Sequence, residues 1–156
     1  MAEVMAKAIA PTGALFTFLA LWTGALWGRP TWGVYWVWDA RLTSMLILLF
    51  LYLGYMALHA AIDDRQRASS ASAVLAMVGV VNVPIIYFSV QWWNTLHQGA
   101  SITVTEAPTM ATIMFVTLLI MTLASWMYAI AVVLARARIE LLERERNARW
   151  VQERME

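Results

Sequence analysis

Four long uncharged stretches divide the chain. They extend from Ala8 to Gly28, from Leu42 to Ile62, from Ala68 to Thr105 and from Ala107 to Ala135. A membrane-spanning helix needs about 20 apolar residues, and in the third stretch only residues 72–90 are apolar enough. We therefore predict an all-α integral membrane helical bundle with four transmembrane helices, at about 8–27, 42–61, 72–90 and 109–135, followed by a charged helical tail over 136–156.

The composition excludes a soluble enzyme. Of the 156 residues, 62% are hydrophobic and 13% are charged, whereas soluble domains are about 45–50% apolar and about 25% charged. The net charge of +1 gives no field that gathers nucleic acid. The chain has no cysteine, which removes disulfides, thiolate metal sites and covalent haem attachment through a CxxCH motif.

Basic residues set the predicted orientation. Four spans put nine of them on the side of the two termini: Lys7, Arg65, Arg67, Arg136, Arg138, Arg144, Arg146, Arg149 and Arg154. The other side has only Arg29 and Arg41. Because basic residues accumulate in cytoplasmic segments, we expect both termini in the cytoplasm. The segments 28–41 (the tryptophan loop) and 91–108 (the histidine loop) then face outward.

The tail contains acidic and basic residues at helical spacing. The pairs Glu140/Arg144 and Glu145/Arg149 lie four residues apart and favour a helix that continues beyond the membrane. We interpret the tail as a solvated face that carries the orientation signal. The alternative is a docking site for a cytoplasmic partner.

The tryptophan loop and its flank hold the first candidate site. Five tryptophans lie within 17 residues: Trp22, Trp27, Trp32, Trp36 and Trp38. If residues 32–39 are helical, four side chains lie within about 60° of one another, namely Trp32, Tyr35, Trp36 and Asp39, while Trp38 points elsewhere. Such a plate suits a large, flat, conjugated ligand. The alternative is an interfacial aromatic belt, although the opposite face has only Trp150.

The histidine loop places His97 on the same membrane face as these tryptophans. A lone histidine is usually structural, but beside an aromatic plate it becomes a candidate axial ligand for a haem iron. His59 follows Asp39 by about 30 Å of helix. It should therefore lie near the cytoplasmic end, where we expect packing or a local hydrogen bond.

Arg29 and Arg41 flank the tryptophan loop on the face that is poor in basic residues. Guanidinium groups pair with carboxylates in a bidentate manner, so we predict that one or both bind haem propionates. The alternative is an arginine paired with Asp39. The sequence shows no glycine-rich phosphate loop and no HExxH motif, and we predict that the chain is not an enzyme.

Two segments carry a family resemblance. They are Trp32–Thr43, which reads WGVYWVWDARLT, and Asn82–Gly99, which reads NVPIIYFSVQWWNTLHQG. The first resembles the WWD signature of membrane haem-handling proteins in cytochrome c biogenesis. With the second it is similar to the CcmC family of haem exporter proteins, and the resemblance covers residues 5 to about 135.

The resemblance implies a function and a set of partners. Members are expected in the bacterial inner membrane, where they hold haem b at the periplasmic face between the WWD segment and two histidines. They deliver it to the haem chaperone CcmE and act with the transporter subunits CcmA and CcmB and with CcmD. His97 matches the second axial histidine. The WWD segment is matched by Trp32, Trp36, Trp38 and Asp39. Arg41 is the candidate for binding a propionate.

The chain departs from the family pattern of six spanning helices, because it starts at what resembles the third. We expect it to be incomplete at its N-terminus and to lack the first axial histidine; alternatively, a partner subunit supplies the missing half. A rival function is a membrane scaffold that recruits cytochrome c assembly partners without binding haem. A third, an enzyme joining haem to apocytochrome, is disfavoured by the Ala-Arg-Leu-Thr that follows the WWD segment.

Overall fold

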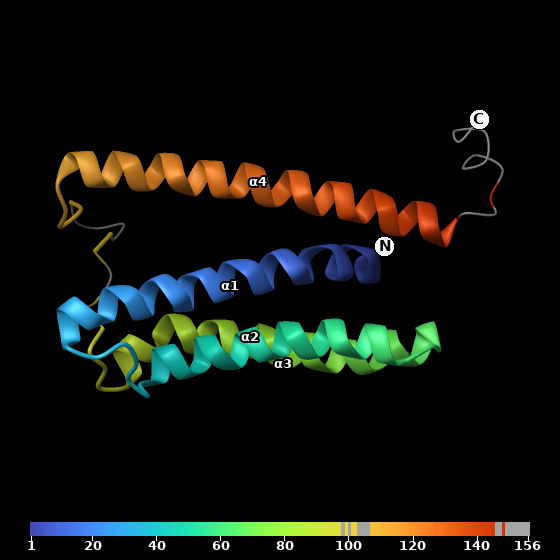
Figure 1. Ribbon diagram of the computed structural model, residues 1–156, viewed down its shortest axis with the longest axis horizontal. Helices are drawn as coiled ribbons and strands as arrows, with labels where there is room; N and C mark the ends of the chain where they lie inside the picture. The colour runs from blue at the N-terminus through green and yellow to red at the C-terminus, as the bar shows by residue number, and fades with distance from the viewer. Residues whose placement is uncertain (98, 100, 103–106, 146–147, 149–156) are drawn as a thin grey trace.

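The computed structural model describes residues 1–97, 99, 101–102, 107–145 and 148. Within them it contains four helices and no strand: α1 (Ala2–Trp32), α2 (Ala40–Ala61), α3 (Arg65–Trp92) and α4 (Thr112–Arg144) (Figure 1). All four are long and apolar enough to cross a membrane. The predicted all-α bundle with four spanning helices is therefore confirmed, and the chain is a multi-pass membrane protein.

Helix α1 ends at Trp32, beyond the predicted end near residue 27. Pro30 lies in its last turn, where it has no N–H for the carbonyl of Leu26 and its ring crowds that carbonyl, so the helix ends soon after. The helix stops at Gly33, which has a φ of 80° and donates its backbone N–H to the carbonyl of Arg29 at 3.0 Å. Glycine reaches this left-handed conformation without a Cβ clash. The connection to α2 is thus only residues 33–39, much shorter than the predicted loop.

Aspartates cap the next two helices. Asp39 precedes α2 and accepts a hydrogen bond from the backbone N–H of Leu42 at 2.8 Å. Asp64 precedes α3 and accepts from the N–H of Arg67, also at 2.8 Å. Each carboxylate satisfies a backbone donor that has no partner within its helix. This cap explains why α3 begins at Arg65, well before the apolar segment that starts near residue 72.

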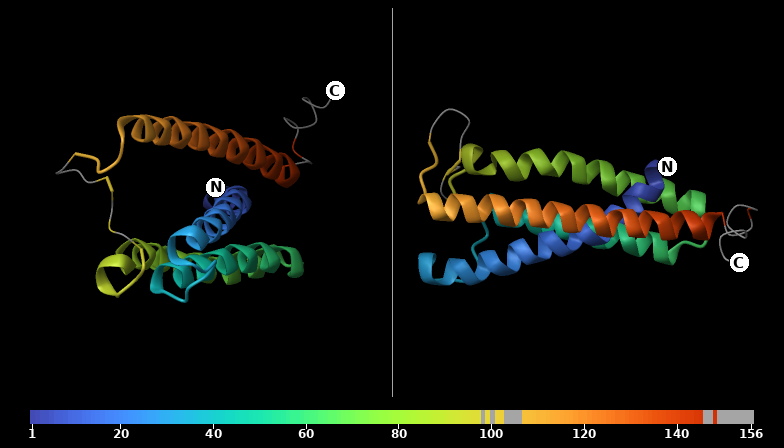
Figure 2. Two further views of the ribbon diagram at one scale, coloured as in Figure 1. Left: turned by 60° about the vertical axis from the view of Figure 1, so that its left-hand side comes forward. Right: turned by 90° about the horizontal axis from the view of Figure 1, so that it is seen from above.

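Helix α2 packs against α3 along much of its length, and α1 packs against α2 (Figures 1 and 2). A Cβ on Gly13 of α1 would lie only 2.5 Å from the ring of Tyr52 of α2, so a glycine permits their close approach. Between α2 and α3, the buried Asn82 side chain donates to the carbonyl of Ser44 at 2.9 Å. This hydrogen bond satisfies a polar group inside the bundle.

Helix α4 is attached at only one end. Small side chains bring it against the start of α1 in a core made of Val4, Ala8 and Ala137. Four charged residues surround this contact and form the ion-pair cluster: Glu3, Lys7, Glu140 and Arg144. Towards its other end, α4 diverges from α1 (Figure 1). The most apolar stretch of α4 has no buried residue within the described part of the chain.

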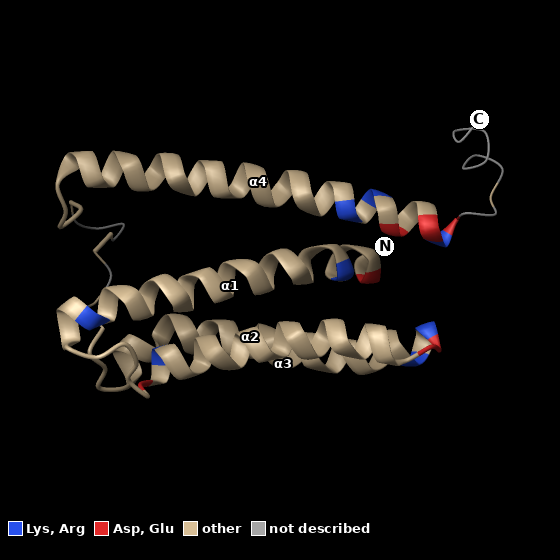
Figure 3. Cartoon of the chain, viewed as in Figure 1, with Lys and Arg blue, Asp and Glu red and all other residues tan. Residues whose placement is uncertain are grey.

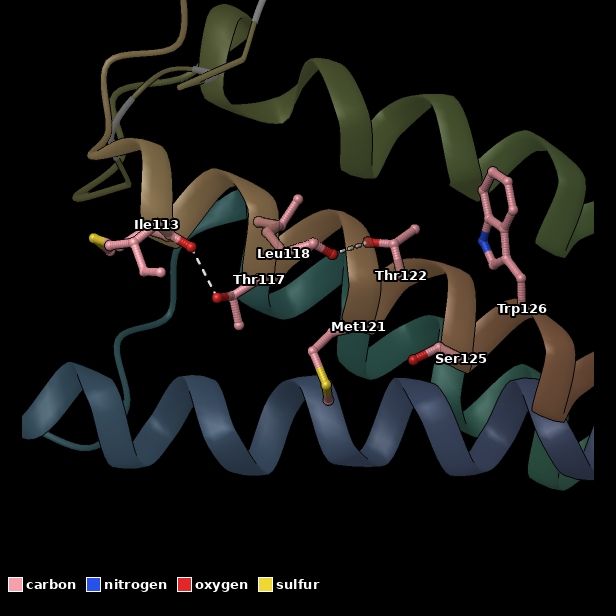
Figure 4. Close-up of a pocket in the computed structure, with 8 residues that line it drawn as sticks. Ile113, Thr117, Leu118, Met121, Thr122, Ser125 and Trp126 are labelled. Carbon is pink, nitrogen blue, oxygen red and sulfur yellow. Dashed lines mark hydrogen bonds between the residues drawn. The ribbon is translucent and has the colours of Figure 1, made fainter.

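An open groove of about 630 Å³ runs along α4 and is lined by that helix alone (Figure 4). Its two threonines, Thr117 and Thr122, donate their hydroxyls at 2.8 Å to carbonyls of the same helix. The lining residues include no ionisable side chain. The groove therefore offers apolar surface but no group for chemistry.

Charged residues gather at the two ends of the bundle (Figure 3). One end, the terminal end, holds the start of α1, the connection between α2 and α3 and the end of α4. The opposite end, the tryptophan end, holds Arg29 in the last turn of α1, and Asp39 and Arg41 at the start of α2. Arg149 and Trp150 lie outside the described residues, but Glu140 and Arg144 do form an i,i+4 ion pair with Nε–Oε1 at 3.2 Å.

Candidate functional site

The tryptophan end brings together residues that are distant in sequence. His97, which follows α3, reaches Asp39 at the start of α2, with its Nδ1 2.6 Å from Oδ2 of the carboxylate. The His97 ring also meets the edge of Trp32 from the end of α1, with ring centroids 4.8 Å apart. Three segments thus converge on one imidazole.

A cavity of about 710 Å³, here called the His97 cavity, opens beside this imidazole. Its lining comes from all three packed helices and the histidine loop: Ala20, Leu21, Thr23, Gly24, Trp27, Trp32, Arg41, Leu42, Met45, Ile86, His97, Gly99 and Ser101. The volume lies within the range of roughly 300–1,000 Å³ typical of small-molecule and cofactor sites. The cavity combines apolar walls with one imidazole and one guanidinium.

Trp27 and Trp32 form the aromatic part of the wall. Their rings meet edge to face, with centroids 5.3 Å apart and planes at 84°. Trp27 was not among the residues predicted to bind, although the sequence contains a signal for it. It shares a helix face with Ala20 and Gly24, at the spacing i, i+4 and i+7, and all three line the cavity.

The condition for a shared aromatic plate, a helix over residues 32–39, is not met. After Gly33 the chain is not helical until Ala40, so Trp36 and Trp38 do not continue the face of Trp32. They contact each other instead, with centroids 5.4 Å apart, and neither lines the His97 cavity. Trp38 is 75% exposed. The left-handed glycine turns the chain away before these side chains can reach the cavity.

The two arginines of the tryptophan end differ in their surroundings. Arg41 lines the His97 cavity. Arg29 donates to the carbonyl of Gly33 and lies 5.5 Å from the ring centroid of Tyr35, so it stabilises the end of α1. The alternative of an arginine paired with Asp39 is not what the described residues show, because both carboxylate oxygens of Asp39 have other partners.

His59 lies at the opposite end of the bundle, in the last turn of α2. About 30 Å of helix separates it from Asp39. Its ring packs against Tyr55, with centroids 4.9 Å apart. Its Nε2 is buried and has no hydrogen-bond partner among the described residues. His59 and His97 therefore cannot contact one ligand atom.

The donor set at the tryptophan end does not suit a free metal ion. Among the described residues there is no group of three or more histidine, cysteine or carboxylate side chains that could hold one. The iron of a haem is already bound by the macrocycle and needs only axial donors from the protein. The imidazole of His97 can supply one of these donors. The site therefore fits haem better than a free metal ion.

Known proteins resemble this chain over most of its length. The profile of the CcmC family, described as Heme exporter protein C, matches residues 1–152. The Heme exporter protein C of Bradyrhizobium diazoefficiens is 55% identical over 144 residues, which cover 92% of this chain and 55% of that protein. The one from Haemophilus influenzae is 54% identical over the same share of this chain and 58% of its own length. The one from Escherichia coli is 60% identical over 101 residues, which cover 65% of this chain and 41% of that protein.

The chain spans about half the length of the curated relatives it matches. The family profile nevertheless covers nearly all of this chain, including α1 to α4 and both segments that carry the resemblance. The family predicted from the sequence is thus confirmed. The chain belongs to the CcmC family.

Proposed function

We propose that the chain binds haem b at the outer face of the bacterial inner membrane and presents it to the haem chaperone CcmE during cytochrome c maturation. One observation carries the proposal: Trp27, Trp32, Arg41 and His97 line a single cavity of about 710 Å³. The names of the relatives, Heme exporter protein C, support the choice of haem as the ligand.

Each side chain has a distinct part in this proposal. His97 would ligate the iron, and haem supplies the iron and the conjugated ring that these residues recognise. The indoles of Trp27 and Trp32 provide apolar surface against the macrocycle. Arg41 would pair with a propionate. The chain makes and breaks no covalent bond in this role, so we propose a carrier and not an enzyme.

A haem titration tests this function. Adding haemin to the detergent-purified chain should produce a shifted Soret band that saturates near one equivalent, because imidazole binding changes the electronic spectrum of the iron. Iron-free protoporphyrin is the control, since it can stack on tryptophan but cannot bind His97. Equal affinity for both would show that the iron is not ligated and would contradict the proposed role of His97.

A scaffold function is the second candidate. It is favoured by the exposure of Trp22, Trp38 and Trp92, because aromatic side chains are enriched at protein interfaces. In this case the partners CcmA, CcmB, CcmD and CcmE would contact the tryptophans directly. The absence of any Soret shift in the haem titration would favour the scaffold.

Thiol labelling tests the proposed orientation, with both termini in the cytoplasm. The chain has no cysteine, so a single introduced cysteine can be labelled without background from other thiols of the chain. Ser101→Cys, at the tryptophan end, should react with a membrane-impermeant reagent in intact spheroplasts. Ser69→Cys, near the start of α3, should react only after permeabilisation. The reverse pattern would invert the topology and place the His97 cavity on the cytoplasmic side.

A further inference from the structure

The contact between Asp39 and His97 is unusually well shielded for a charged group. The Asp39 side chain is 5% exposed and that of His97 is 18% exposed. Both oxygens of the carboxylate are engaged, because Oδ1 accepts from the Leu42 N–H at 2.8 Å and Oδ2 lies 2.6 Å from Nδ1 of His97. The cap of α2 therefore fixes the carboxylate in the position from which it contacts the imidazole.

This contact determines which ring nitrogen is free. An ionised carboxylate only accepts hydrogen bonds, so this contact favours the tautomer of His97 in which Nδ1 carries the proton and donates it to Oδ2. The lone pair then lies on Nε2, the nitrogen that can bind a metal. Metal-binding histidines almost always donate their other N–H to a carboxylate or carbonyl, which fixes the ring and raises the basicity of the ligand.

Asp39 also lies where a helix favours an acidic side chain. It lies at the N-terminus of α2, where the unpaired N–H groups and the helix dipole favour an anion. A buried negative charge beside the imidazole favours the iron state with the higher positive charge. The ferric porphyrin core carries one more positive charge than the ferrous core, and the attraction is strong because water is excluded.

We propose that Asp39 is a positioning residue that acts through His97: it directs Nε2 to the haem iron, strengthens that bond and favours ferric over ferrous haem. The inference rests on the proposed haem function and goes beyond it. It assigns to the aspartate of the WWD segment two linked tasks, capping α2 and setting the donor strength of His97. In this assignment Asp39 does not contact the macrocycle.

The competing explanation is that Asp39 serves only as a helix cap. Asp39→Asn separates the two, because asparagine caps helices about as well as aspartate. The variant retains an oxygen for the Leu42 N–H and removes the negative charge next to His97. Asp64→Asn is the matched control: Asp64 caps α3 with the same 2.8 Å geometry, but at the terminal end of the bundle.

The experiment compares the full chain with these two variants in detergent. For Asp39→Asn we expect haem affinity to fall about 10–100-fold. At a fixed solution potential, we expect the ratio of ferric to ferrous haem to fall about tenfold, and the iron–histidine stretching frequency of the ferrous form to decrease. Asp64→Asn should leave all three quantities at their wild-type values.

The outcomes separate this inference from the function on which it rests. If wild-type protein binds haem and Asp39→Asn changes neither the redox equilibrium nor the iron–histidine frequency, Asp39 is only a cap and the inference is overturned. If wild-type protein shows no Soret shift, the proposed function fails and the inference fails with it. Nitrogen NMR of the haem-free chain gives an independent test. A proton on Nε2 of His97, in place of Nδ1, also overturns the inference.

Discussion

His97→Ala is expected to abolish tight haem binding by the purified chain. The substitution removes the imidazole that lines the His97 cavity and leaves Oδ2 of the buried Asp39 carboxylate without its partner. The loss should exceed the roughly 10–100-fold that follows removal of a residue supporting a metal ligand. The measurement is the amplitude and position of the Soret band during haemin titration.

His59→Ala is the control for this variant, because it makes the same substitution at the opposite end of the bundle. It should titrate like wild-type protein. Free imidazole added to His97→Ala should restore part of the shifted band, since the ligand can diffuse into the space left by the side chain. An unaltered titration of His97→Ala would mean that the iron is bound elsewhere or not at all.

Arg144→Ala is expected to detach α4 from α1. Arg144 joins the two helices, with Nη2 2.8 Å from Oε1 of Glu3 and Nε 3.2 Å from Oε1 of Glu140. Its loss leaves two partly buried carboxylates with one cation, Lys7, which lies 3.0 Å from Glu140. We expect a loss of about 1–3 kcal/mol in the free energy of unfolding, the range for leaving a buried polar group without its partner.

Denaturant unfolding in mild detergent, followed by circular dichroism, measures this loss. Arg138→Ala is the matched control, because Arg138 is an exposed arginine of the same helix. It should change stability by less than about 0.5 kcal/mol, as surface substitutions usually do. Equal stability of the two variants would show that the ion-pair cluster contributes no more than solvent-exposed pairs do, about 0–1 kcal/mol.

The membrane helices could be predicted from sequence because length and the absence of charge are sufficient criteria. Their true ends could not, since those depend on local capping that the hydropathy pattern does not record. Gly33 and Asp64 are examples: the first stops α1 through a left-handed backbone, and the second starts α3 in a polar segment. Glycine commonly ends helices and aspartate commonly caps their N-termini, but tertiary context decides which glycine or aspartate has this role.

The candidate site was predictable in its chemistry but only partly in its geometry. Sequence reasoning placed His97 and the tryptophan loop on one face, and the structure brings His97, Trp32, Asp39 and Arg41 together. The shared helical face of Trp32 and Trp36 was not found, because the chain leaves the helix at Gly33; a role of Trp36 in binding stays a prediction. The contribution of α3 through Ile86 had no local signal, since it depends on how α3 packs against α2.

The one-sided attachment of α4 has a mechanical consequence. From Ala137, where α4 meets α1, to Thr112, the helix extends about 37 Å at 1.5 Å per residue. A tilt of about 5° about the ion-pair cluster would therefore move Thr112 by about 3 Å. A small change in the geometry of the four charged side chains would thus be enlarged along α4 before it reaches the far end of the helix.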